Sequence, residues 1–361
     1  MHKLLLGLLL IVLLPFSVQL HAATPDGEMM QQQDPGAELW NAVRGRVAAD
    51  PGQVRTQVRG VDNTVLVNRD GEDWMKFRME QLIPNAAKLL GFVALAIIVF
   101  RLVRGKIPIK SGRSTQKIKR FSAFQRYVHW TTAILFVALG LTGIALLFGR
   151  YIIIPVFGSA VGGDLMLGLK AIHDYAGPLF AVALAVLVLT FMKGNFAHFS
   201  DIKWIFKGGG LFGGHAPAGR YNAGEKGWYW IAAIVGSVVV VSGLVLDLPN
   251  FPVVAEWVSG FIPVVDQSRN TISYYHWIHG IAAVAIMAAA MGHIYMGTIA
   301  MEGAFEPMQT GYCDANWAKE HHDLWYEEMV EKGLILDADA IPGQHSPSQQ
   351  PAESVHGNPA T

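Results

Sequence analysis

The stretch that decides the fold is Ile278–Ile299, IHGIAAVAIMAAAMGHIYMGTI, in which two histidines interrupt a run of apolar and small residues. A run of roughly 20 such residues is long enough to cross a bilayer as a helix. Ionisable side chains are costly inside a membrane and usually have a function there. This stretch therefore predicts a membrane-spanning helix in which His279 and His293 are functional.

The whole chain has the composition of a membrane protein. Of its 361 residues, 52% are hydrophobic and only 16% are charged, whereas about 25% are charged in an ordinary soluble domain. Four more apolar runs precede the first stretch, so we predict an all-α integral membrane fold with five spanning helices. We place the spans near Asn85–Val103, Val128–Phe148, Ile172–Met192, Trp228–Leu246 and Ile278–Ile299.

The single cysteine, Cys313, excludes several kinds of site. A disulfide framework, a cysteine-ligated iron–sulfur cluster and a C-x-x-C-H haem attachment motif all need more than one cysteine. The chain carries no nucleotide-binding motif, and we expect no nucleic-acid partner. The 13 histidines therefore remain as the candidate ligands.

The N-terminal region has three predicted parts. Residues 1–23 are typical of a secretory signal, with a short basic start, an apolar centre and a small-residue end. An uncleaved anchor is the alternative, and in both cases the following chain starts outside the cytoplasm. Residues 24–83 form a polar periplasmic extension, either a docking segment for another subunit or a spacer. Residues 84–104 form an extra span ahead of the other four.

Basic residues set the predicted orientation. Residues 105–126 contain many lysines and arginines and no acid, and residues 193–227 are also rich in bases. The positive-inside rule places both segments and the C-terminal end in the cytoplasm. We therefore predict a multi-pass protein of the bacterial inner membrane with its mature N-terminus in the periplasm. Residues 331–361 form a polar tail that we expect to lack a fixed structure.

His279 and His293 face almost the same side of one predicted helix. They are 14 residues apart, which corresponds to about 21 Å of rise and falls about 40° short of four full turns. In the predicted topology the last span runs from outside to inside. His279 therefore lies near the periplasmic surface and His293 near the cytoplasmic surface.

Two further histidines match these depths. His129 opens a span that starts inside, and His173 opens a span that starts outside. The pairs at a common depth are therefore His129 with His293 and His173 with His279. Two facing imidazoles are what a six-coordinate haem b requires. We predict two haems b in a four-helix domain, residues 127–330, that transfer electrons and do not bind oxygen.

His276 competes with His279 as a ligand, because it lies one turn earlier. However, its 17-residue distance from His293 puts it about 100° off the ligand face, so we expect it at the interface. The remaining histidines are expected on solvated surfaces of the loops and the tail. They are His198, His215, His321, His322, His345 and His356.

Short motifs surround the predicted ligands and continue into the tail. They are Phe124–Trp130 (FQRYVHW), Ile172–Gly177 (IHDYAG), Tyr221–Lys226 (YNAGEK), Ile278–Gly280 (IHG), Gly292–Met296 (GHIYM), Gly303–Phe305 (GAF) and Trp317–Tyr326 (WAKEHHDLWY). Together they resemble the gamma subunit of respiratory formate dehydrogenase, a membrane cytochrome b, over about residues 120–330. The four-helix, two-haem core alone is shared with the cytochrome b subunit of nickel–iron hydrogenases, which is the alternative family.

The resemblance implies a place in a larger complex. It implies that the four matching histidines ligate haem with the pairing derived above, and that Asn222 and Gly224 border a quinone near the cytoplasmic haem. The implied partners are an exported molybdenum or tungsten subunit that oxidises formate and an iron–sulfur subunit that feeds the periplasmic haem. Quinone is the implied electron acceptor. A homo-oligomer of the complex is left open.

The chain departs from the short form of that family at two places. Glu225 stands where Gln is frequent, so it either passes a proton to the quinone or is an exposed acid of the loop. The first 110 residues match only a longer variant of the family. A third interpretation, from another class, is a haem-free membrane anchor or transporter, which the lack of b-type bands in a reduced-minus-oxidised spectrum would support.

Overall fold

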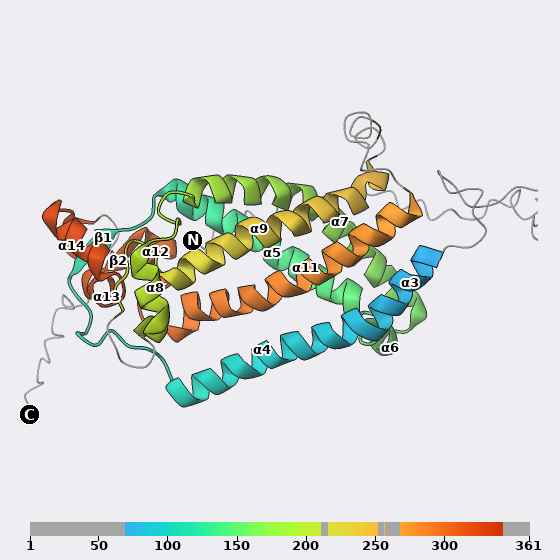
Figure 1. The fold of residues 1–361 in the computed structure, drawn as a ribbon, viewed down its shortest axis with the longest axis horizontal. Helices are drawn as coiled ribbons and strands as arrows, with labels where there is room; N and C mark the ends of the chain where they lie inside the picture. The colour runs from blue at the N-terminus through green and yellow to red at the C-terminus, as the bar shows by residue number, and fades with distance from the viewer. Residues whose placement is uncertain (1–68, 211–215, 252–255, 257–267, 342–361) are drawn as a thin grey trace, which may run out of the picture. The chain divides into compact units, whose positions relative to one another are not determined.

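A computed structural model describes residues 69–210, 216–251, 256 and 268–341 (Figure 1). All of these belong to one compact unit, residues 66–361. The predicted signal at residues 1–23, and the greater part of the predicted extension at 24–83, lie outside the described residues.

Helices dominate the described residues, and five helical stretches among them are long and apolar enough to cross a membrane. The predicted all-α membrane fold with five spans is confirmed. The helical elements are α3 (Arg69–Phe77), η1 (Arg78–Leu82), α4 (Ile83–Arg104), α5 (Ala123–Phe148), α6 (Ile153–Phe157), α7 (Ser159–Phe191), α8 (Phe199–Phe206), η2 (Gly208–Gly210), α9 (Ala223–Asp247), η3 (Leu248–Asn250), α11 (Arg269–Tyr295), η5 (Met296–Ala300), α12 (Glu306–Thr310), α13 (Ala315–His321), α14 (Asp323–Glu331) and η6 (Ala338–Ala340).

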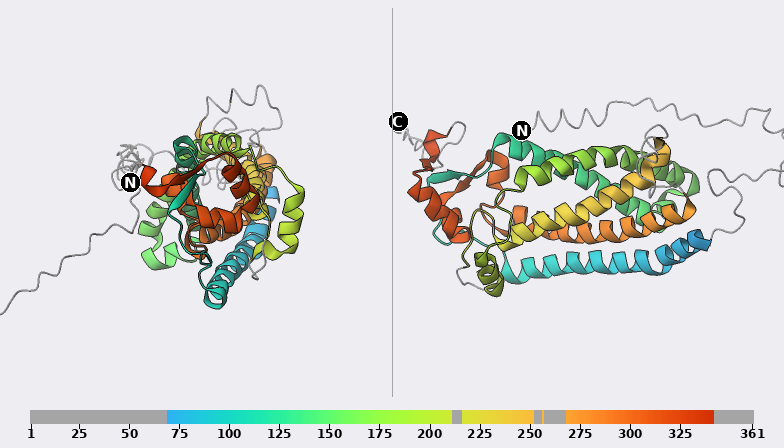
Figure 2. Two further views of the ribbon diagram at one scale, coloured as in Figure 1. Left: turned by 90° about the vertical axis from the view of Figure 1, so that its left-hand side faces the viewer. Right: turned by 45° about the horizontal axis from the view of Figure 1, so that its top comes forward.

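Four long helices form the bundle that holds the histidines. Helices α5, α7, α9 and α11 lie side by side, and α5 packs on α7, α7 on α9, and α9 on α11 (Figures 1 and 2). All four begin earlier than predicted, and the largest differences are in α7, which begins at Ser159, and α11, which begins at Arg269. Backbone hydrogen bonding continues into polar residues such as Asp164 and Lys170, which a search for apolar runs leaves out.

The extra N-terminal span packs against α11. It begins in the predicted extension, because α3, η1 and α4 form one continuous helical stretch from Arg69 to Arg104. Pro84 has no N–H to donate, and the wide π-helical turn η1 ends two residues before it. Leu82 packs closely on Gly280. A Cβ built on Gly280 would lie 2.7 Å from Leu82 Cδ2. Trp74 stacks on His276, with ring centres 5.1 Å apart.

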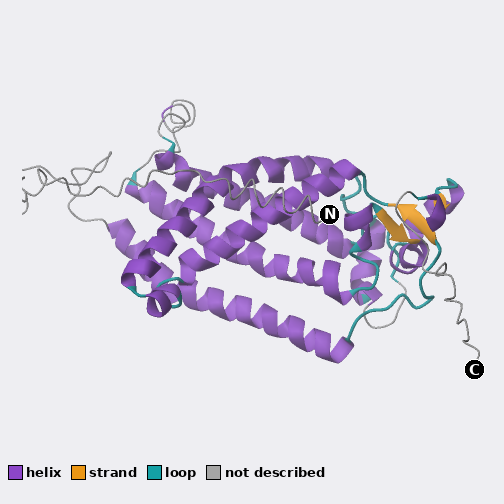
Figure 3. Ribbon diagram, turned by 180° about the vertical axis from the view of Figure 1, so that it is seen from behind, coloured by secondary structure: helices purple, strands orange, loops and turns teal. Residues whose placement is uncertain are grey.

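A small sheet covers one end of the bundle, which we call the sheet end; the opposite end is the far end (Figure 3). Its strands are β1 (Gln116–Lys119), β2 (Tyr312–Asp314) and β3 (Ile335–Asp337), in the antiparallel order β2-β1-β3. The sheet and helices α12 to α14 form the cap. The expectation that residues 331–361 lack a fixed structure is wrong for residues 335–337, because β3 pairs with β1 and satisfies its backbone groups there.

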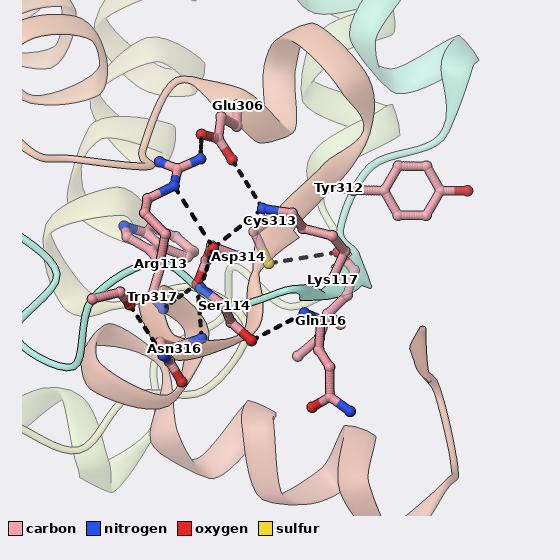
Figure 4. A network of polar contacts seen from close by, with 12 residues as sticks. Arg113, Ser114, Gln116, Lys117, Glu306, Tyr312, Cys313, Asp314, Asn316 and Trp317 are labelled. Atoms are coloured by element: carbon pink, nitrogen blue, oxygen red, sulfur yellow. Dashed lines mark hydrogen bonds and ion pairs between the residues drawn. The ribbon is translucent and has the colours of Figure 1, made fainter. Parts of the chain in front are cut away.

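The cap has its own apolar core and one buried acid. Ile118, Cys313 and Trp317 are buried at the centre of that core. Asp314 is fully buried and accepts hydrogen bonds from Ser114 N at 3.0 Å and Lys117 Nζ at 3.2 Å (Figure 4). The basic segment between the first two spans is therefore folded back on the C-terminal part of the chain and paired with its acids.

Candidate haem-binding site

The far-end pair consists of His173 on α7 and His279 on α11. Their ring centres are 6.3 Å apart and their planes are inclined at 83°. The two histidines come from helices far apart in the sequence, and the fold brings their rings together in an edge-to-face arrangement between those helices. The structure thus brings together these two of the predicted site residues.

Two hydroxyl groups orient the rings of the far-end pair. Thr142 Oγ1 donates to Ala138 O at 2.8 Å, so its oxygen accepts from His173 Nδ1 at 2.8 Å. His279 Nδ1 lies 3.0 Å from Val239 O, which can only accept, and 3.2 Å from Ser242 Oγ. In both rings this assigns the proton to Nδ1 and leaves the Nε2 lone pair for a metal ion, an arrangement that raises ligand basicity.

A glycine follows each of these hydroxyl residues and admits the histidine ring. A Cβ built on Gly143 of α5 would lie 3.4 Å from His173 Cε1. A Cβ built on Gly243 of α9 would lie 3.0 Å from His279 Cε1, a distance that real contacts rarely reach. Helices α5 and α9 therefore use the same pair of features, a hydroxyl acceptor followed by a glycine, against the two rings.

The sheet-end pair consists of His129 on α5 and His293 on α11. Their ring centres are 6.4 Å apart and their planes are inclined at 60°. Trp228 of α9 stacks on His293 at 4.6 Å between ring centres, with the planes 13° apart. Nδ1 of His129 is buried and has no hydrogen-bond partner among the described residues. Among the residues that the structure describes, aromatic rings contact this pair and no hydroxyl group is hydrogen-bonded to either imidazole.

Both pairs fit a metal held between two imidazoles. Metal–imidazole bonds are about 2 Å long, which puts two axial rings on one metal roughly 6 Å apart between centres. The observed 6.3 and 6.4 Å agree with this value. The lone-pair assignment in the far-end pair supplies the neutral ligand that haem iron binds. His276 is turned elsewhere, because its ring stacks on Trp74 of the N-terminal helix.

The loop before α9 forms a helix cap at the sheet end. Asn222 Oδ1 accepts from Glu225 N at 3.0 Å, and Glu225 Oε2 accepts from Asn222 N at 3.1 Å, which is a capping box. Gly224 lies under the ring of Trp204, and a Cβ built there would be 3.1 Å from that ring. The structure therefore gives Asn222 the capping role that its residue type favours.

Glu225 is an ion-paired acid of the loop: its side chain is 37% exposed and is bound by a buried arginine. Arg120 is only 3% exposed. Its guanidinium donates to Glu225 Oε1 and Oε2 at 3.0 and 3.1 Å and to Arg220 O at 2.8 Å. The same guanidinium lies 4.8 Å from the ring centre of Trp317 in the cap. Arg120 thus fastens the loop before α9 to the cap.

The expectation that His322 lies on a solvated surface is wrong. Its side chain is 1% exposed and sits between Arg120 and Trp325, with Nδ1 2.8 Å from Gly219 O. Burial, helped by the nearby positive charge of Arg120, lowers the pKa of His322 to about 4. The ring is therefore neutral at pH 7 and joins the cap to the loop before α9.

Sequence reasoning missed the residues that support the histidines. Thr142 and Ser242 each precede a glycine in the middle of an apolar span, and this repeated hydroxyl–glycine pair is a signal that could have found them. Trp228 and Arg120 gave no comparable signal, because an aromatic residue or a base near a span end is common.

Comparisons with known proteins agree with this arrangement. The family of prokaryotic cytochrome b561 matches residues 120–311, which is more than half of the chain. The nitrate-inducible formate dehydrogenase cytochrome b556(Fdn) subunit of Escherichia coli K12 is 27% identical over 220 residues, covering 60% of this chain and 93% of that protein.

Two further relatives have the same kind of name. The formate dehydrogenase cytochrome b556(fdo) subunit of Escherichia coli K12 is 28% identical over 216 residues, covering 59% of this chain and 93% of that protein. The formate dehydrogenase cytochrome b556 subunit of Haemophilus influenzae is 28% identical over 229 residues, covering 61% and 87%. The predicted resemblance to the formate dehydrogenase gamma subunit is confirmed. With its family match, five spans and facing histidines, the chain belongs to the prokaryotic cytochrome b561 family and has the membrane haem b electron-transfer role of that family.

Proposed function

We propose that this chain is the quinone-reducing cytochrome b subunit of a membrane-bound formate dehydrogenase. The observation that carries the proposal is the presence of two facing histidine pairs in a chain whose relatives are formate dehydrogenase subunits. In this proposal His173 and His279 would hold one haem b at the far end, and His129 and His293 would hold a second at the sheet end. Haem supplies one-electron transfer, and two protein ligands leave its iron no open position for oxygen.

The sheet end faces the cytoplasm in this proposal. The segments rich in Lys and Arg, residues 105–126 and 193–227, connect the spans at that end. A periplasmic reporter fused after residue 60 is expected to be active, and one fused after residue 330 inactive. The reverse pattern would overturn the orientation and exchange the compartments of the two histidine pairs.

The partners follow from the orientation and the relatives. A molybdenum or tungsten subunit in the periplasm oxidises formate, and an iron–sulfur subunit delivers the electrons at the far end. Reduction of one quinone to quinol takes two electrons and two protons, and the protons come from the cytoplasm. Each electron that crosses fully against the membrane potential is worth about 2.3 kcal/mol per 100 mV, so the complex conserves energy by its geometry.

Asn222 and Gly224 border the quinone in this proposal. Asn222 Oδ1 is used in the helix cap, so its amide Nδ2–H is the group that donates a hydrogen bond to a quinone carbonyl. Glu225 is paired with Arg120, which favours a structural role for this acid over proton delivery. Trp228, near the start of α9, stacks on His293, so the sheet-end histidine pair and the loop before α9 lie at the same end of the bundle.

The experiment separates capping from quinone binding. Asp caps helices as well as Asn does, but a carboxylate has no N–H group with which to donate a hydrogen bond. In the complex purified with its partner subunits, Asn222→Asp should therefore lower formate-driven quinone reduction while formate still reduces both haems. Asn222→Ala should do the same with some loss of stability. Unchanged quinone turnover in Asn222→Asp would move the site away from this loop, and co-purification with a hydrogenase subunit would reject formate as the donor.

A further inference from the structure

Helix α8, in the connection between α7 and α9, has an apolar face that no described residue covers. Phe199 is 84% exposed and Phe206 is 87% exposed, and Ile202 and Ile205 are each more than half exposed. At 100° per residue these four side chains fall within an arc of about 120°. An arc of this width is the apolar face of an amphipathic helix.

The opposite face of α8 is fastened to the start of α9. Asp201 accepts from Lys226 Nζ at 2.9 Å through both of its oxygens. The ring of Trp204 lies against Gly224, the residue two positions after Asn222. Helix α8 is therefore held in a fixed orientation, with its apolar face turned away from the chain.

Helix α8 lies where a helix at the membrane surface is expected. It lies at the sheet end of the bundle, between the end of one span and the start of the next (Figures 1 and 2). The spans on either side of it also expose apolar side chains: Leu189 of α7 is 70% exposed and Ile234 of α9 is 59% exposed. Lys203 lies within the helix, and Lys193 and Lys207 lie before and after it.

We propose that α8 lies in the boundary between lipid headgroups and acyl chains, and that quinone enters its site along this helix. An amphipathic helix with aromatic residues on one face and lysines beside it binds the interface through apolar burial and attraction to anionic lipids. Trp204 then forms the lipid-side wall of the pocket that Asn222 and Gly224 border. The entry route rests on the proposed quinone site; the seating of α8 in lipid does not.

The first experiment tests the seating of α8. Phe199→Cys and Phe206→Cys are spin-labelled in the full chain, reconstituted in nanodiscs of phosphatidylethanolamine and phosphatidylglycerol. The native Cys313 will not compete, because it is fully buried and burial raises its pKa to about 12. Leu189→Cys serves as the lipid control and Lys319→Cys, on the exposed side of α13, as the water control.

Accessibility to oxygen and to a water-soluble nickel chelate gives the result. Both α8 labels should resemble the Leu189→Cys label, with oxygen contact favoured several-fold over nickel contact. Labels that resemble Lys319→Cys would overturn the proposal and indicate a surface for a protein partner. Partial accessibility to nickel that is the same in nanodiscs with and without phosphatidylglycerol would also overturn it, because the lysines should draw the helix toward anionic lipid.

The second experiment tests the entry route. The double variant Phe199→Asp/Phe206→Asp should lower turnover several-fold with a long-chain isoprenoid quinone in the membrane. Turnover with a short-chain, water-soluble quinone should stay unchanged, and so should the haem content. Phe199→Leu/Phe206→Leu, which keeps the face apolar, is the matched control and should behave as the parent chain.

Two outcomes would overturn the route. Unchanged turnover with both quinones would mean that α8 does not line the path, and an equal loss with both would mean that these residues act on the site or the fold. Failure of the proposed quinone site has a different signature. The complex with the unaltered chain would then reduce neither quinone, although formate still reduces its haems.

Discussion

The far-end and sheet-end pairs have almost the same spacing but are held in different ways. In the far-end pair, Thr142 and Ser242 accept from the Nδ1 atoms and two glycines admit the rings. In the sheet-end pair, Trp228 stacks on His293 and the Nδ1 atom of His129 has no partner among the described residues. The same ligand geometry can therefore be set either by small and polar residues within the bundle or by aromatic packing next to a cap.

The largest effect is expected from filling the space beside His279. In Gly243→Val a branched side chain would meet His279 Cε1, which already lies 3.0 Å from the position of a Cβ. The far-end haem should be lost while the sheet-end haem remains, as measured by haem content and optical redox titration. Gly91→Val, at an exposed site on α4 with no atom within 4 Å of its Cβ, is the control. Loss of both haems would contradict separate sites.

Removing the hydroxyl acceptors should weaken the far-end haem without abolishing it. Loss of a partner that orients a metal ligand typically costs about 10–100-fold in metal affinity. Thr142→Val should therefore lower the occupancy of the far-end haem, and Ser242→Ala should lower it less, because Val239 O still accepts from His279 Nδ1 at 3.0 Å. Haem titration of the apo chain measures the affinity. Thr298→Val removes a hydroxyl whose one hydrogen-bond partner among the described residues is Ile294 O at 2.6 Å, and it should have no effect. An equal effect on the sheet-end haem would show that the difference between the pairs is not real.

The stacking of Trp228 offers the matching test at the sheet end. An aromatic pair is worth about 0.5–1.5 kcal/mol beyond its buried area, so Trp228→Leu should weaken the sheet-end haem by at most about tenfold. Trp228→Phe keeps a ring against His293 and should restore the affinity. A lower affinity for the far-end haem alone would reverse the assignment of the two sites.

The smallest effect concerns the cap and its dependence on pH. His322 has its pKa lowered by burial to about 4, against an ordinary value of 6.5. Because the folded cap keeps this ring neutral, the contribution of His322 to the stability of the cap is complete above pH 6.5 and is lost as the pH falls toward 4. Hydrogen exchange in α13 and α14 should be faster at pH 5 than at pH 7.5, after correction for intrinsic rates.

The control for the cap is His322→Asn, which cannot titrate in this range. Its exchange in α13 and α14 should depend much less on pH, and exchange in the centre of the spans should not change in either protein. Equal pH dependence in both proteins would assign the effect to another group.

The sequence alone predicted the spans and the histidine pairs because both follow simple rules. A bilayer imposes a length on apolar runs, and a helix imposes an azimuth on residues 14 apart. The cap could not be predicted in the same way, since β3 consists of Ile335–Asp337 alone and depends on pairing with β1 from far along the chain. His322 looked like a surface residue, because only the fold brings Arg120 and Gly219 around it.

The number of haems in ligand variants tests the central claim most directly. The full chain should bind two haems b, measured as haem per polypeptide together with a two-step optical redox titration. His279→Ala should lose the far-end haem and His293→Ala the sheet-end haem, while His276→Ala, whose ring stacks on Trp74, should keep both. A chain that binds a single haem, or one that loses a haem through His276 and keeps it through His279, would contradict the account.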